Sequence, residues 1–162
     1  ISYLTSALCD ELKWTTKSSK EKLAFAALFH DIAIKETKLC SLTYSDDRVL
    51  KGMDEDKRKT YFQHPIQAAE LVKELDTKYP QVGDIIIQHH ERPDGSGFPK
   101  GLTHHNIPAL SSLFIVAQDY VMRASLSDFK KTPSEIIEEI APVYTEGHFK
   151  KCLSAMRKLL DS

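Results

Sequence analysis

Apolar residues recur at intervals of three and four along most of this sequence, and no other feature constrains the fold more. The first stretch shows the period in Ile1, Leu4, Leu8 and Leu12. This spacing places side chains on one face of an α-helix, whereas a strand would need alternation. At 162 residues, 41% of them hydrophobic, the chain has the size of one domain with one core. We therefore expect an all-α fold, a compact bundle of about seven helices, that spans 1–162 as one domain and lacks some native upstream sequence.

The same period predicts where the helices lie. Seven segments show it, covering about residues 1–14, 19–31, 61–75, 82–90, 108–120, 133–140 and 147–160. The second segment ends in LAFAALF, which is apolar nearly all round, so we expect this helix to be central to the domain. Ser18 or Ser19 is its predicted N-cap. In the third segment Pro65 suits the first turn of a helix, which would place His64 at the start of that helix.

Two long segments lack the helical period and are expected to be loops. Residues 35–57 should form a loop with room for one short helix. Residues 92–106 contain three glycines and two prolines, the composition of a structured loop, in which Gly95 and Gly97 should supply turns with positive φ. The apolar run 85–87 could form a strand, but no alternating partner run lies nearby. We therefore prefer a helix there.

Charge and composition exclude several classes of function. Charged residues make up 28% of the chain and nearly cancel, to a net charge of -1, so no overall field attracts a nucleic acid polymer. A small, doubly charged ligand remains compatible with this balance. No apolar run approaches the ~20 residues of a membrane span, and no leader-like start is present, so we expect a soluble cytoplasmic protein without a membrane partner. Three cysteines without CxxC spacing indicate neither disulfides nor a zinc ribbon.

Histidines are the side chains most able to carry chemistry in this sequence. Four of the seven lie at the ends of apolar helices, in three patches: His30 beside Asp31, His64, and His89 with His90. Each alone could be a hydrogen-bonded core residue. Together they offer what a first-row metal needs, neutral imidazoles and a carboxylate that project inward from several helices. We therefore predict a central metal site.

The adjacent histidines bear on how many ions this site holds. Neighbouring residues point about 100° apart on a helix, so His89 and His90 suit two ions better than one. Asp31 would then be the bridging carboxylate. Asp119, at the end of the apolar run LFIVAQD, would be a further ligand unless it caps a helix or faces solvent. Two ions that share a bridging hydroxide suit in-line hydrolysis of a phosphodiester.

These residues resemble a known family. His30-Asp31 resembles the HD motif of the HD superfamily of metal-dependent phosphohydrolases. HHERPDGSGFP, at 89–99, closely resembles the HHExxDGxGYP signature of the HD-GYP branch, with Phe98 in place of the tyrosine. YFQHPIQAAELV, at 61–72, is similar to the family's helix with an HP-x-x-G/A-A pattern. The chain looks like a divergent HD-GYP domain, and the resemblance extends over most of it.

The resemblance implies a signalling enzyme of the bacterial cytoplasm and a set of site residues. The implied activity is hydrolysis of cyclic di-GMP by a hydroxide held in a dinuclear centre of two or three divalent ions, with iron expected first and manganese or zinc as alternatives. The expected metal ligands are His30, Asp31, His64, His89, His90 and Asp119. Asp31 and Lys35 are the expected catalytic residues, and Arg92 and Lys130 the expected substrate contacts. The residues expected to shape the site are Glu91, Asp94, Gly95, Gly97, Phe98 and Pro99.

Several positions depart from the family pattern and leave alternatives open. The lysine of the family's HDxGK motif falls on Ile34, one position before Lys35, and the last ligand aspartate falls on Gln118, next to Asp119. The family's first ligand histidine falls upstream of Ile1. One alternative is therefore a weak or inactive module that binds cyclic di-GMP or docks onto diguanylate cyclase-type signalling domains. Another is an HD-superfamily hydrolase of ordinary nucleotides, although the DGSGFP loop argues against it.

Overall fold

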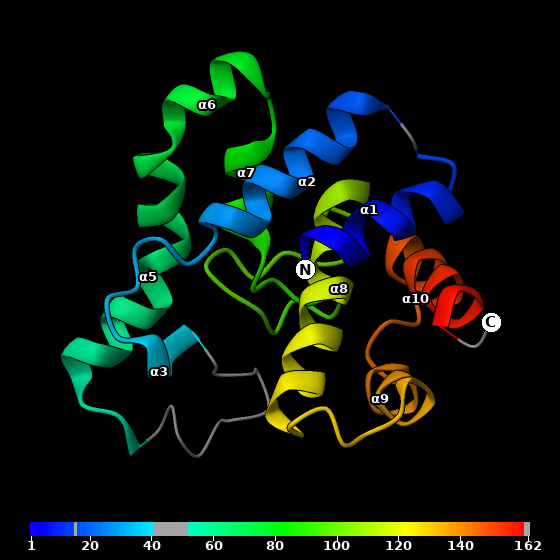
Figure 1. Cartoon of the computed structure of the whole chain (residues 1–162). Helices are drawn as coiled ribbons and strands as arrows, with labels where there is room; N and C mark the ends of the chain where they lie inside the picture. Colours follow the sequence, from blue (N-terminus) through cyan, green and yellow to red (C-terminus); the bar gives the residue numbers. More distant parts are fainter. Residues whose placement is uncertain (15, 41–51, 161–162) are drawn as a thin grey trace.

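The computed structural model describes residues 1–14, 16–40 and 52–160, and within them the chain forms nine helices and no strand (Figure 1). The helices are α1 (Ser2–Glu11), α2 (Lys17–Phe29), α3 (Thr37–Cys40), α5 (Glu55–Leu71), α6 (Lys73–Lys78), α7 (Val82–Gln88), α8 (Ala109–Leu126), α9 (Pro133–Ile140) and α10 (Gly147–Leu160). The all-α prediction is confirmed. In the described part of the chain, no helix combines the length and the apolar character that a membrane span needs.

The centre of the bundle is α8. It packs against α1, α2, α7, α9 and α10, and Figure 1 shows it running through the middle of the fold. Its stretch 111–118 is buried throughout. The prediction that the second helix is central is wrong, because only Leu23 and Ala26 of α2 are buried and Leu28 is 70% exposed. The apolar run at the end of α2 therefore covers the core with one side only.

Two predicted helix starts are also wrong. The N-cap of α2 is Thr16, whose hydroxyl accepts the backbone N–H of Ser19 at 3.0 Å, so neither predicted serine is the cap. The N-cap of α5 is Asp54, far upstream of the predicted start. His64 and Pro65 consequently lie in the interior of α5 rather than in its first turn.

The element that assembles the site is α7, which confirms the helix predicted for residues 85–87. It packs against α2, α5 and α8. Its last residue is Gln88, so the two following histidines lie directly after a helix that contacts both α2 and α5. The predicted loop 35–57 contains the short helix α3, as expected, and its residues 41–51 lie outside the described residues.

Candidate metal centre

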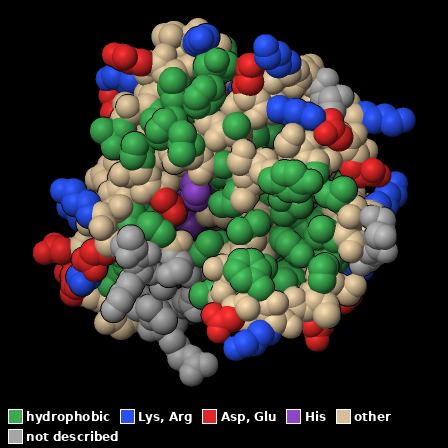
Figure 2. All heavy atoms as spheres, viewed as in Figure 1, with side chains coloured by type: hydrophobic (Ala, Val, Ile, Leu, Met, Phe, Trp, Pro, Cys, Tyr) green, Lys and Arg blue, Asp and Glu red, His purple; other side chains and the backbone are tan. Residues whose placement is uncertain are grey.

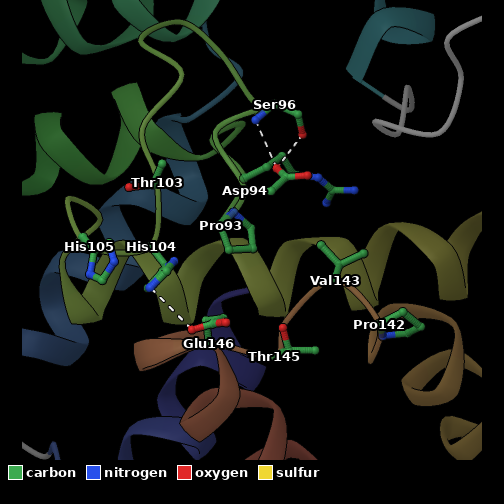
Figure 3. A pocket seen from close by; sticks show the side chains of 11 residues that line it. Pro93, Asp94, Ser96, Thr103, His104, His105, Pro142, Val143, Thr145 and Glu146 are labelled. Carbon is green, nitrogen blue, oxygen red and sulfur yellow. Dashed lines mark hydrogen bonds and ion pairs between the residues drawn. The ribbon is translucent and has the colours of Figure 1, made fainter.

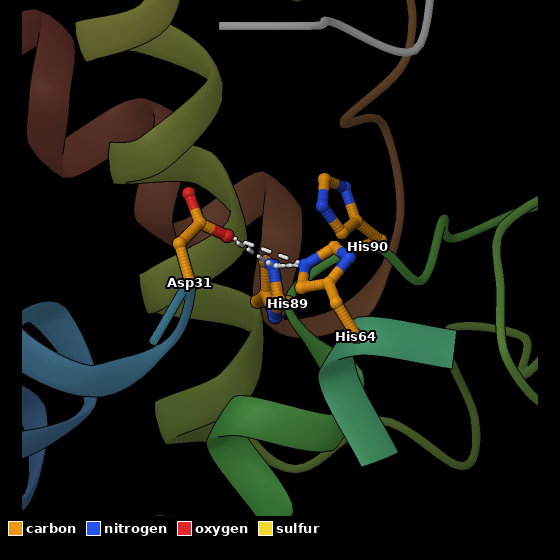
Figure 4. A group of neighbouring side chains, drawn as sticks. All are labelled: Asp31, His64, His89 and His90. Carbon is orange, nitrogen blue, oxygen red and sulfur yellow. Dashed lines mark hydrogen bonds and ion pairs between the residues drawn. The ribbon is translucent and has the colours of Figure 1, made fainter. Parts of the chain in front are cut away.

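Four side chains from three parts of the chain converge on one point. Asp31 comes from the turn after α2, His64 from α5, and His89 and His90 from the end of α7. One possible ligand atom of each lies within 4.8 Å of the others. Figure 4 shows the four side chains around a common point, and Figure 2 shows histidine and acidic side chains at the base of a hollow in the surface. The structure thus brings together four of the six predicted ligands.

The closest approaches in this group involve one carboxylate oxygen and two imidazole nitrogens. Oδ1 of Asp31 lies 3.2 Å from Nε2 of His64 and 3.6 Å from Nε2 of His89. The two Nε2 atoms are 3.1 Å apart. Oδ1 of Asp31 is buried and has no hydrogen-bond partner in the described part of the chain. Burying an acceptor atom without a partner costs folding free energy, unless a cation or a hydrogen-bond donor binds to it.

Backbone contacts decide which nitrogen of each ring carries the proton. In His30, His64 and His89 the Nδ1 atom faces the carbonyl oxygen of the residue three positions earlier, at 3.1, 2.5 and 2.6 Å. A carbonyl can only accept, so each Nδ1 carries the hydrogen. The lone pair of each neutral ring is then on Nε2, the atom that faces Asp31. All three rings therefore turn an Nε2 lone pair toward Asp31, two of them (His64 and His89) toward Oδ1 and His30 toward Oδ2.

The charge states favour a cation at this point. Burial lowers the pKa of His89 to about 4, and it also lowers the pKa values of His30 and His90, so these rings are neutral at pH 7. Burial alone would raise the pKa of Asp31, but in the acidic range in which this carboxyl titrates, hydrogen bonds donated by the rings of His64 and His89 outweigh burial and hold that pKa below its usual range, so the carboxylate is ionised at pH 7. An ionised carboxylate and neutral imidazoles are the protonation states that metal binding requires.

The residues present therefore fit a divalent metal ion. Lone pairs on two nitrogens and one anionic oxygen repel one another at this distance, and a cation between them would turn the repulsion into attraction. Ligands held ~2.1 Å from one tetrahedral ion lie roughly 3.4 Å apart, close to the observed spacing of 3.1 to 3.6 Å. The backbone carbonyls that accept from Nδ1 are the outer partners that metal-bound histidines usually have.

His30 lies beside this group, on the other oxygen of the carboxylate. Its Nε2 is 3.5 Å from Oδ2 of Asp31, whereas His64 and His89 approach Oδ1. The two oxygens of Asp31 thus face different histidines, as a bridging carboxylate requires. The helical premise that assigned His89 and His90 to separate ions is wrong, because α7 ends at Gln88 and both rings offer an atom to the same group.

Asp119 is held away from this group by other partners. Its Oδ2 accepts the hydroxyl of Tyr144 at 2.9 Å and an N–H of Arg92 at 3.4 Å. Its Oδ1 accepts from Nε of Arg123 at 2.9 Å. The prediction that Asp119 joins the cluster as a ligand is therefore not met, because two guanidinium groups and a phenol already satisfy this buried carboxylate.

The neighbouring Gln118 takes the place that the family pattern gave to the last ligand. Its side chain is buried, and its Oε1 has no hydrogen-bond partner in the described residues. Phe114, one helical turn earlier on α8, packs its ring against that of His30 at 5.5 Å between centroids. Since residues four apart share a face of a helix, Gln118 points to the same side of α8 as Phe114. A neutral amide thus stands where a carboxylate was expected.

The predicted substrate contacts are not gathered at the cluster. Arg92 is 11% exposed, is bound to Asp119, and lines a cavity of about 530 Å³ between its own loop and the segment around Glu146 (Figure 3). Lys130 is 80% exposed and pairs with Asp128 at 3.3 Å. Lys35 is exposed in the segment that follows the Asp31 turn. Lys35, predicted as a catalytic residue, follows the ligand Asp31 by four residues, and Arg92 follows the ligand His90 by two.

The loop after the histidines is tied to them by its backbone. The buried carboxylate of Glu91 accepts the N–H groups of Lys100 and Leu102 at 2.7 and 2.8 Å. The ring of Phe98 stacks on that of His90, with 4.6 Å between centroids and 17° between planes. The N–H of Phe98 also donates to the carbonyl of His90 at 3.1 Å. The loop and the ligand turn therefore form one unit.

The two glycines predicted to supply turns with positive φ, Gly95 and Gly97, serve different purposes. Gly95 has a φ of +80°, as predicted, and Asp94 stabilises the turn by accepting from the backbone and hydroxyl of Ser96. Gly97 does not have a positive φ. A Cβ at Gly97 would instead lie 2.4 Å from the backbone nitrogen of Arg92, so this glycine is needed for a close approach. Pro99 follows through a cis peptide bond from Phe98.

Sequence reasoning missed two side chains near the site. The thiol of Cys40, from α3, lies beside Asp31, and burial together with this carboxylate raises the pKa of Cys40. Tyr144, from the segment before α10, closes the ion-pair network around Asp119. Neither has a signal in the sequence, because a four-residue helix has no measurable period and because Tyr144 lies 25 residues from its partner.

Fold and site together define an all-helical, metal-binding type of domain, and comparison with known proteins gives the family. The family model described as HD domain matches residues 1–146. The cyclic di-GMP phosphodiesterase response regulator RpfG of Xanthomonas campestris is 30% identical over 112 residues, which are 67% of this chain and 28% of that protein. A cyclic di-GMP phosphodiesterase of Thermotoga maritima is 25% identical over 164 residues, 98% of this chain and 42% of that protein.

A solved structure shows the same likeness in three dimensions. Bd1817, a HDG"Y"P protein from Bdellovibrio bacteriovorus, superposes with a TM-score of 0.72 and 26% identity, over 99% of this chain and 50% of that chain. The chain therefore belongs to the HD domain family. The predicted relationship to the HD-GYP proteins is confirmed by these relatives. The chain spans less than half the length of the curated relatives it matches.

Proposed function

We propose that this chain hydrolyses cyclic di-GMP with divalent metal ions held by its histidine and aspartate group. The observation that carries the proposal is the convergence of Nε2 lone pairs on the unpartnered Oδ1 of Asp31. The substrate is supported by the names of the relatives, each a cyclic di-GMP phosphodiesterase, and by the sequence of the loop at 89–99.

The ligand set supports one complete position and one partial position. Asp31 Oδ1 with His64, His89 and His90 would hold the first ion. Asp31 Oδ2 with His30 would contribute to a second, which makes Asp31 the bridge of a dinuclear centre. Imidazole and carboxylate donors suit iron, manganese and zinc alike, and we propose iron first because the sequence resembles the HD-GYP family. Bound ions would polarise the phosphoryl group and lower the pKa of a water molecule.

The protein's own side chains would contribute charge, access and orientation. The ionised Asp31 balances part of the charge of the cations, and its side chain remains 20% exposed, so a phosphodiester can reach the group from solvent. His64 and His89 are fully buried and held by backbone carbonyls, so they would keep their geometry during turnover. Lys35, next along the chain from this turn, is the proposed contact to phosphate.

The test uses a substitution that keeps the shape of the site. Asp31→Asn removes the negative charge and one ligand oxygen, while Asp128→Asn makes the same change at an exposed carboxylate. Metal-loaded protein would be incubated with cyclic di-GMP and the products separated by chromatography. We expect guanosine products from the wild type and from Asp128→Asn, and at least about a hundredfold slower turnover from Asp31→Asn. Full turnover by Asp31→Asn would contradict the proposal.

A second candidate function is a receptor that binds cyclic di-GMP without rapid turnover. The arrangement around Asp119 favours it, because this carboxylate and Arg92 are bound to each other instead of facing the cluster. Gln118 also offers the second ion a weaker ligand than a carboxylate. A receptor of this kind would pass its signal to a diguanylate cyclase-type domain. Ligand binding measured by calorimetry without nucleotide products would select this function over the enzyme.

A further inference from the structure

The turn that carries His89 and His90 lies beyond the end of α7, whose last residue is Gln88. Its position therefore depends on contacts of its own side chains and of the residues that follow it. Glu91 is fully buried, and its carboxylate accepts two backbone N–H groups of the same loop. This contact joins the turn to its own loop and not to another helix.

Arg92 makes the link to another helix. Its side chain is nearly buried, and an N–H of its guanidinium donates to Oδ2 of Asp119, on α8, at 3.4 Å. The same nitrogen donates to the hydroxyl of Tyr144 at 3.1 Å, and that hydroxyl donates to Oδ2 of Asp119 at 2.9 Å. The three side chains thus bond to one another in a closed triangle. This triangle ties residue 92, two positions after His90, to the central helix of the fold.

A further partner holds Asp119 itself in place. Its Oδ1 accepts from Nε of Arg123 at 2.9 Å, one helical turn along α8. Another nitrogen of Arg123 lies 3.6 Å from a carboxylate oxygen of Glu139, on α9. Replacing buried ion pairs by well-packed apolar side chains often leaves stability unchanged or higher. Stability alone therefore does not account for charged side chains at these positions.

We infer that Asp119 is a positioning residue of the metal centre: through Arg92 it fixes the turn that carries the last two histidines of the cluster. The inference rests on the proposed metal-binding function. The same helix also contacts His30, because Phe114 of α8 packs its ring against the ring of this histidine. The central helix is thus a common frame for ligands from two separate parts of the chain.

The test compares two substitutions that each take one guanidinium from the same carboxylate. Arg92→Gln breaks the link to the ligand turn, whereas Arg123→Gln, the matched control, breaks a link within α8. For each protein we would measure the urea midpoint of the metal-free form and the affinity for Mn²⁺ alone. We expect both variants to lose stability, but only Arg92→Gln to bind Mn²⁺ more weakly, by roughly tenfold.

A double-mutant cycle separates the contact with Asp119 from every other contact of Arg92. Asp119→Asn should also weaken Mn²⁺ binding by roughly tenfold. The double variant should bind no more weakly than either single variant, because each single substitution already breaks the contact. Tyr144→Phe keeps both charges and removes one hydroxyl from the triangle, so it takes the place of Asp119→Asn should that variant not fold. We expect it to bind Mn²⁺ about threefold more weakly.

NMR of the metal-free proteins reports the position of the turn directly. Asp119→Asn should shift the backbone amide signals of His89 and His90, whereas Arg123→Gln should leave them in place. Unchanged Mn²⁺ affinity in Arg92→Gln, an equal loss in Arg123→Gln, or additive losses in the double variant would overturn the inference. Absence of Mn²⁺ binding by the wild type would refute the proposed function instead, while the amide signals would still decide the role of Asp119.

Discussion

Acidification should destabilise the metal-free protein by protonating a histidine that the fold keeps neutral. Burial lowers the pKa of His89 to about 4, from an ordinary value of ~6.5. Between these two values the unfolded chain binds a proton that the folded chain excludes. The stabilising contribution is therefore complete above pH ~6.5 and is lost as the pH falls toward 4. Burial also lowers the pKa values of His30 and His90, which acts in the same direction.

The size of the effect follows from the shift. A pKa of about 4 in the folded chain, against ~6.5 in the unfolded chain, corresponds to roughly 3 kcal/mol at the limit, and to about 2 kcal/mol between pH 7.5 and pH 5. Urea unfolding of chelator-treated protein at these two pH values would measure it. His89→Asn removes the titrating ring. Between pH 7.5 and pH 5 the free energy of unfolding of this variant should therefore fall by about 2 kcal/mol less than that of the wild type. The same substitution at the exposed His105 is the control.

One result would refute this reasoning. If the wild type, His89→Asn and His105→Asn all lose the same free energy of unfolding between pH 7.5 and pH 5, then His89 is not the group that the fold keeps neutral. The convergence of neutral imidazoles on Asp31 would then lose its electrostatic basis.

Two substitutions in the loop after the histidines give further tests. Glu91→Gln removes the charge that strengthens two hydrogen bonds to backbone N–H groups, and we expect the free energy of unfolding to fall by about 1 to 3 kcal/mol in urea titrations; unchanged stability would show that the loop is held by other contacts. Gly97→Ala places a Cβ 2.4 Å from backbone, so the ligand turn must move. We expect this variant to lose Mn²⁺ affinity, whereas wild-type affinity would show that the loop is not rigidly joined to His90.

The helical architecture and the core of the site could be predicted from the sequence for a clear physical reason. The helical period is a local property, and it placed helices around each of the histidine patches. Burying several histidines and an aspartate together requires a compensating interaction, so convergence was expected. Asp31, His64, His89 and His90 do converge. The contact among these four residues, which are far apart in the sequence, could be expected because each of them is a potential metal ligand near the end of an apolar segment.

What the sequence could not predict depends on packing between distant segments. Gln118 and Asp119 are adjacent, and only the partners around α8 decide which of them faces the cluster. The apolar run in α2 does not reveal that Leu28 faces solvent, because that depends on which helices cover it. Pro65 suggested a helix start, since its local preference is for the first turn. It lies instead in the interior of α5, because that helix begins at Glu55 with Asp54 as its N-cap.

The most direct test of the metal centre is the number of metal ions bound per chain. Protein purified without chelator would be compared by elemental analysis with Asp31→Asn, both with the fold confirmed by circular dichroism. The geometry predicts one ion for the Asp31, His64, His89 and His90 group, a second where His30 shares the carboxylate, and loss of both in Asp31→Asn. Less than one ion per wild-type chain, or equal metal content in the variant, would contradict the proposed metal centre.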